Sequence, residues 1–189
     1  VQTRWGHINR DYSTLTKMKL DLYDNTDVFL HIGIVDCSRR VLSVKALRII
    51  LMLPLLRSIV KKIAHKYHYS LTNAYKIVYT KEKSFEKNLT WFVGEFKESR
   101  IWILPILPVG EALRKKSYGI DHQVKTYNSI IKKIAEKNHN VVFLHSISKF
   151  FNLNDQALYM NDGYHLNKKS HKIIYEYIIN KLTEKENEN

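Results

Sequence analysis

The chain is almost without cysteine, because its 189 residues contain only Cys37. A single thiol excludes an intramolecular disulfide, and it slightly favours a reducing compartment such as the cytoplasm. The chain begins Val1-Gln2-Thr3 without an initiator methionine, so we expect a segment upstream of Val1.

Long apolar runs are also absent. No stretch approaches 18 consecutive apolar residues, which excludes a transmembrane helix of ordinary length. The longest run, residues 49–56, contains Pro54 and lies between Arg48 and Arg57. With 44% hydrophobic residues, the composition is that of a globular protein long enough to bury a substantial core.

Acidic residues are few: 18 stand against 31 lysines and arginines, for a net charge of +13. A charge of this sign favours anionic partners. The lysines are spread along the chain rather than clustered, which is typical of a solvated surface. We therefore do not expect nucleic acid as a partner, although a basic nucleic-acid-binding protein stays an alternative.

Buried strands alternate with helices along the chain. Nearly continuous apolar runs predict strands at 28–35, 101–108 and 141–144, and residues 1–4 fit the end of an earlier strand. This alternation predicts an α/β fold with an open, mainly parallel sheet and helices on both faces, in three α/β/α layers. Ligands of such sheets bind beyond the carboxyl ends of the strands.

Apolar spacings of three and four residues predict the helices. They fall at about residues 9–23, 43–67, 70–97 and 124–137, and in a last helix capped by Asn167. Pro54 should kink or divide the second of these. The excursion at 43–97 is expected to pack on the sheet as a helical layer, with a functional cap or a basic amphipathic helix on a membrane as alternatives. We expect one domain over residues 1–182 and a charged tail at 183–189.

The stretch 161–167 carries the clearest chemical signal. Asp162 and His165 lie three residues apart on a tight turn that Gly163 permits. A carboxylate this close to an imidazole can accept the Nδ1 proton and leave Nε2 free to act as a base. A capping arrangement at the start of the last helix is the alternative explanation.

This block resembles the last motif of the SGNH (GDSL-like) hydrolases, an Asp-x-x-His at the entry of the C-terminal helix. Tyr127-Asn128, ahead of a short valine-rich strand, is also similar to that family. Gly33 and Asp36 fall where the family carries Gly-x-Asn-Asp, and Gly6 falls where it carries an isolated glycine. The resemblance implies a flavodoxin-like sheet and hydrolysis of an O-acyl, most plausibly O-acetyl, ester of a carbohydrate or small molecule, without a metal or cofactor.

The resemblance also implies roles for single residues. His165 would be the base, Asp162 would orient it, and the Gly6 N–H would belong to an oxyanion hole. Two departures matter. Val35 stands where the family has the oxyanion-hole Asn, and the strand ending in Gly-Asp-Ser, which supplies the nucleophile, has no counterpart. The nucleophile and the first central strand are therefore expected upstream of Val1, and their absence would expose sheet edges.

Within the chain, Ser38 and Cys37 are possible but weak substitutes for that serine, since their neighbours form no nucleophile elbow. The departures leave a second interpretation open, a catalytically inactive SGNH-like binding module.

Further histidines and arginines are weighed as site residues. His7 is a possible substrate contact beside Gly6. Arg39, with Arg40, is a possible partner for an anionic sugar or phosphate, against a solvated turn or a salt bridge. His31 fits a core histidine inside a strand better than a catalyst. His65 and His68 have no nearby ligand in register for a metal.

Overall fold

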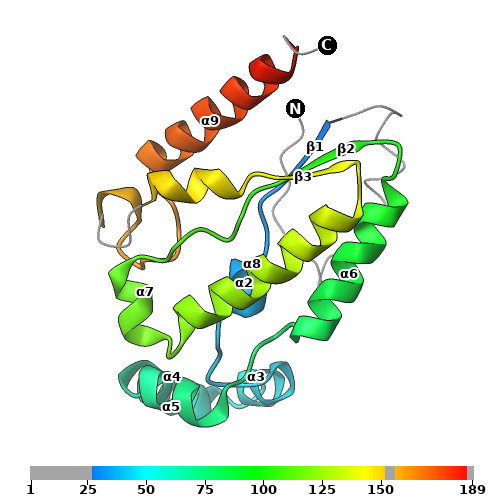
Figure 1. Ribbon diagram of the computed structural model, residues 1–189. Coiled ribbons are helices and arrows are strands. Elements are labelled where there is room, and N and C mark those ends of the chain that lie inside the picture. Colours follow the sequence, from blue (N-terminus) through cyan, green and yellow to red (C-terminus); the bar gives the residue numbers. More distant parts are fainter. Residues whose placement is uncertain (1–26, 152–155, 187–189) are drawn as a thin grey trace.

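The structure is a computed structural model that describes residues 27–151 and 156–186 (Figure 1). The strand predicted at 1–4, the helix predicted at 9–23 and the candidate residues Gly6 and His7 lie outside these ranges. The described part is an α/β protein with a small parallel sheet and mostly helices. Its elements are β1 (Asp27–Leu30), α2 (Ile34–Cys37), α3 (Val44–Leu51), α4 (Pro54–Lys66), α5 (His68–Tyr75), α6 (Glu82–Glu95), β2 (Arg100–Ile103), α7 (Glu111–Lys116), α8 (Ile120–Lys137), β3 (Val141–Phe143), two 3-10 helices η1 (His145–Phe150) and η2 (Gln156–Leu158), and α9 (Lys168–Glu186).

The sheet confirms the predicted parallel pairing of three strands. Their order is β1-β2-β3, with Val28 opposite Ile101 and Ile101 opposite Val141. Parallel neighbours require crossover connections, which α2–α6 provide before β2 and α7–α8 provide before β3. All three carboxyl ends therefore lie along one edge of the sheet.

Apolar side chains are buried on both faces of β2. Ile101 and Ile103 pack with residues of α6 and α8, whereas Trp102 packs with residues of η1 and α9. Alternate residues of a strand point to opposite faces, so one four-residue strand contributes to both apolar clusters. Figure 1 shows α6 and α8 on one side of the strands and α9 on the other.

The strand predicted at 28–35 is shorter than expected. Hydrogen bonding ends at Leu30, and Ile34 and Val35 belong to the short helix α2. The cause is Gly33, which adopts a left-handed conformation with φ 108° and turns the chain. His31 consequently follows the strand, so the prediction of a histidine inside a strand was wrong, although burial lowers the pKa of its imidazole to about 4.

The second strand also ends early, at Ile103, although residues 104–109 stay buried or half-buried. Beyond this point the side chain of Asn128, on α8, makes the backbone hydrogen bonds that a neighbouring strand would make. Its Oδ1 accepts the Ile106 N–H at 2.8 Å, and its Nδ2 donates to the Ile106 carbonyl at 2.8 Å. One side chain thus satisfies the backbone that leads from β2 to α7.

The helical excursion differs from the predicted layer on the sheet. Pro54 does divide the first helix, since α3 ends at Leu51 and α4 begins at Pro54. The second predicted helix is broken between α5 and α6, where Lys76 has φ 49°. Helix α6 packs on α8. Helix α3 packs on α4, α4 on α5 and α5 on α7, at the lower end in Figure 1.

The last helix forms as predicted. Asn167 caps it, because its Oδ1 accepts the Ser170 N–H at 3.2 Å. The predicted inner-face residues pack against the β2 and η1 cluster: Ile173, Ile174, Tyr177, Ile178 and Leu182. The helix continues to Glu186, beyond the point where the charged tail was expected to begin. Among the helices described, none is both long and apolar enough to cross a membrane.

Candidate active site

The Asp162–His165 turn holds a carboxylate against an imidazole. Asp162 Oδ1 accepts the backbone N–H groups of Tyr164 at 2.8 Å and His165 at 2.9 Å. Asp162 Oδ2 lies 2.6 Å from His165 Nδ1. A carboxylate can only accept, so Nδ1 carries the shared proton and Nε2 is the free ring nitrogen. The contact expected from the spacing of these two residues is present.

Close backbone contacts fix this turn on the body of the protein. Gly163, at φ 67°, accepts the Gly110 N–H through its carbonyl at 2.9 Å. A Cβ on Gly163 would lie 2.6 Å from the backbone nitrogen of Leu113. Gly110 stands at the N-cap of α7, at the end of the buried segment that leaves β2. The turn is therefore attached at the carboxyl edge of the sheet, where the parallel topology places ligands.

Tyr164 connects the turn to the segment that follows α2. Burial raises the pKa of the half-buried Tyr164 phenol, and the neighbouring Arg40 guanidinium partly offsets this rise. Arg40 also lies over the Tyr79 ring, 5.0 Å from its centroid, and its Nη2 donates weakly to the Val35 carbonyl at 3.4 Å. The Arg40 guanidinium is thus held beside Tyr164, the residue that precedes His165.

Gly33 and Asp36, two of the site residues predicted from the sequence, are buried inside the protein. A Cβ on Gly33 would come within 2.5 Å of Ile106 Cδ1, so only glycine fits this turn. Asp36 is fully buried, and its Oδ1 accepts the Thr80 hydroxyl at 2.6 Å. Asp36 therefore ties α2 to the segment between α5 and α6, a position that does not reach solvent.

The structure separates Arg39 from its neighbour Arg40. The Arg39 guanidinium lies over the Tyr118 ring, 5.2 Å from its centroid, and beside Gly119 at the start of α8. Arg40, which follows it, contacts the Asp162–His165 turn through Tyr164 instead. Of the two cations considered from the sequence, Arg40 is the one placed beside the candidate dyad.

Neither Cys37 nor Ser38 is suited to replace the serine nucleophile. Burial raises the pKa of the Cys37 thiol to about 12, with a further rise from the Asp36 charge, so the thiolate does not form near neutrality. Ser38 is buried and its hydroxyl donates to the Ile34 carbonyl at 2.5 Å. Within the described ranges, no hydroxyl or thiol is hydrogen-bonded to His165.

The remaining histidines of residues 27–151 and 156–186 form no ligand cluster. His68 Nδ1 lies 2.8 Å from the Lys116 carbonyl, a contact that joins α5 to α7. No group of three or more His, Cys, Asp or Glu side chains suited to a metal ion occurs in the described part of the chain.

Sequence reasoning overlooked Tyr164 and Thr80. Tyr164 lies inside the Asp-x-x-His block, where an aromatic residue between the acid and the base was the available signal. Thr80 carries no such signal, because its partner Asp36 is 44 residues away.

Comparisons of the chain with protein-family models, with curated proteins and with solved structures found no match.

The titration of Asp162 offers a direct check of the dyad. Partial burial alone would raise its pKa, but hydrogen bonds from His165 and Tyr164 and the His165 charge lower it from 3.8 to about 2. Because the folded value is the lower one, the stabilisation is complete above about pH 4 and is lost as the pH falls through about 2. Carbon-13 NMR of the Asp162 carboxyl should give a midpoint near 2 that rises in His165→Ala. A wild-type midpoint near 3.8 would contradict the geometry.

Proposed function

We propose that the protein is an SGNH-type ester hydrolase in which His165 is the general base and Asp162 orients it. The observation that carries the proposal is the 2.6 Å contact between Asp162 Oδ2 and His165 Nδ1. It holds the imidazole in the tautomer that leaves Nε2 able to take a proton from a serine hydroxyl. The His165 side chain is 63% exposed, so a substrate can approach it.

The position of the dyad supports the same proposal. It lies at the carboxyl edge of a parallel sheet, at the entry of the last helix, as in the three-layer SGNH fold that the sequence resembles. The order of β1, β2 and β3 is compatible with that fold. In this proposal a serine preceding Val1 supplies the nucleophile, and the substrate is an O-acyl ester, such as an O-acetyl ester, of a carbohydrate or small molecule.

The oxyanion hole of this enzyme would differ from that of the family. Val35, in place of the Asn, is half-buried in α2 and offers no side-chain donor. The loss of one such donor typically costs about 10²–10³-fold in rate. Val35 is also the observation that favours the second candidate, an inactive binding module of the same fold, which predicts no turnover at all.

Asp162→Asn is the sharpest variant for this proposal. The amide keeps an oxygen for the N–H groups of Tyr164 and His165, but its NH₂ cannot accept the Nδ1 proton. We expect acetate release from an O-acetylated oligosaccharide by the full-length protein to fall about 10⁴-fold, because the imidazole is left in the wrong tautomer.

Asp121→Asn is the matched control, since Asp121 pairs with Arg114 at 2.9 Å and lies on α8. It should leave acetate release unchanged. Equal activity of Asp162→Asn and the wild type would refute the role of Asp162, and a folded protein without any esterase activity would favour the inactive module.

A further inference from the structure

Helices α3 and α4 expose apolar side chains that a folded protein normally covers. Ile49 is 61% exposed and Met52 is 79% exposed. Ile59 and Ile63, four residues apart, lie on one side of α4 and are about half exposed. We use the name α3–α4 face for these residues and their exposed apolar neighbours, which together are Leu47, Ile49, Leu51, Met52, Leu53, Ile59, Ile63 and Tyr67.

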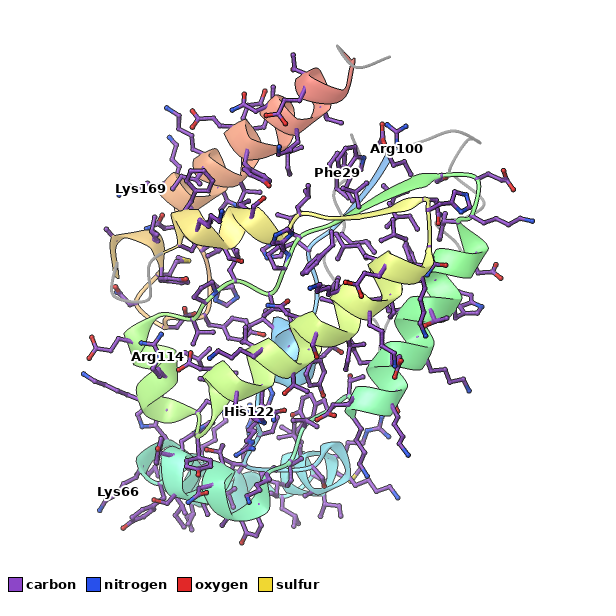
Figure 2. All side chains as sticks on the ribbon, viewed as in Figure 1. Phe29, Lys66, Arg100, Arg114, His122 and Lys169 are labelled. Carbon is purple, nitrogen blue, oxygen red and sulfur yellow. The ribbon has the colours of Figure 1, made fainter. Side chains whose placement is uncertain are left out.

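The charges around this face have one sign. From residue 37 to residue 81 the chain contains no Asp or Glu. Six cations lie within α3 and α4, and each has an exposed side chain: Lys45, Arg48, Arg57, Lys61, Lys62 and Lys66. Lys62 and Lys66 are one turn apart beside Ile59 and Ile63, and Lys66 projects away from the protein in Figure 2. The face is therefore both apolar and strongly basic.

Within residues 27–151 and 156–186, the α3–α4 face stays exposed. Helix α3 contacts α4, α4 contacts α5, and α5 contacts α7, so this unit is attached at one end (Figure 1). The sheet and helices α6, α8 and α9 have apolar partners of their own in the two core clusters. An apolar surface of this kind marks an interaction site.

We propose that the α3–α4 face docks on an anionic lipid bilayer, with both helices lying in the interface. Lipid headgroups of negative charge complement the six cations, and the acyl boundary takes up the isoleucines, leucines and Met52. Lysine stems cover apolar surface while their charges stay in water, and Tyr67 has the amphipathic character of interfacial aromatics.

Other occupants fit the face less well. A nucleic acid would complement the cations but leave the apolar side chains in water. A second copy of the chain would bring the same six cations against one another across a two-fold interface. An anionic bilayer complements the cations and also covers the apolar side chains. This inference does not depend on the esterase proposal.

Flotation of the full-length protein with vesicles tests the proposal. The probes are phosphatidylcholine vesicles and vesicles with about one third phosphatidylglycerol. Binding should require the anionic lipid and weaken with salt. Each lysine near such a surface contributes about 1 kcal/mol, so Lys61→Gln, Lys62→Gln and Lys66→Gln together should lower partitioning about 100-fold. Ile59→Glu with Ile63→Glu should lower it at least about tenfold.

Matched controls separate this face from general charge and hydrophobicity. Replacement of Lys87, Lys125 and Lys149 by Gln removes the same charge from exposed positions elsewhere, and Ile179→Glu changes an isoleucine of α9 that is 41% exposed. Both controls should keep vesicle binding. The proposal is overturned if neither vesicle is bound, if the controls lose binding equally, or if RNA or DNA is bound instead. A dimer in solution that Ile59→Glu with Ile63→Glu dissociates would also overturn it, because the face would then be a protein interface.

Discussion

His165→Ala in the full-length protein is expected to lower kcat/KM for an acetyl ester by about 10⁶-fold, the effect of removing the base from other triads. Asp162 holds Nδ1, so in the proposed mechanism Nε2 of this one ring takes the serine proton and returns it to the leaving group. Without the imidazole the hydroxyl stays protonated, and the remaining rate comes from binding and from whatever oxyanion donors are present.

His171→Ala is the matched control for this variant. His171 is exposed on the first turn of α9, six residues beyond His165, and its backbone N–H bonds to the Asn167 carbonyl. The variant should retain activity within about twofold of the wild type. If His165→Ala kept wild-type kcat/KM with the same protein preparation, the base would have to be sought elsewhere.

Gly163→Ala is the second variant with a large expected effect. It disrupts the packing of the turn on α7 and leaves the Asp162 and His165 side chains unchanged. Alanine at φ 67° is strained by about 1–2 kcal/mol. Its Cβ would also meet backbone atoms of α7, Leu113 N at 2.6 Å and Gly110 O at 3.1 Å. We expect a loss of about 3 kcal/mol in the free energy of unfolding and a parallel loss of esterase activity.

Gly94→Ala is the control for Gly163→Ala, and it is expected to raise the free energy of unfolding. Gly94 lies in α6, it is exposed, and a Cβ there would meet no atom within 4 Å. Alanine should therefore stabilise the protein by about 0.5–1 kcal/mol through its higher helix propensity. Urea unfolding of both variants measures the difference. A Gly163→Ala variant as stable as the wild type would show that the turn is not packed on Gly110 and α7 as described.

The features that the sequence predicted correctly depend on short-range rules. The Asp162–His165 contact needs only three residues and a glycine turn, and the Asn167 cap is equally local. Pro54 divides its helix because a proline inside a helix lacks an N–H and clashes with the preceding turn. The inner face of α9 follows from its 3.6-residue period.

The features that it missed depend on what packs against each segment. Periodicity showed that α3 and α4 have apolar faces, but it could not show that Ile49 and Met52 are exposed in the fold. Arg39 and Arg40 are adjacent in the chain, yet one lies over Tyr118 and the other beside Tyr164, in different parts of the fold. Val35 was assigned to a strand because an apolar run does not reveal that Gly33 turns into a left-handed conformation.

In the proposed function, the Asp162–His165 pair activates a serine. Labelling of the folded full-length protein with a serine-directed phosphonate, with the modified residue located by mass spectrometry, tests it most directly. We expect one covalently modified serine in the wild type and in His171→Ala, and no modification in His165→Ala. An unlabelled wild-type protein, or a serine modified equally fast in His165→Ala, would contradict it.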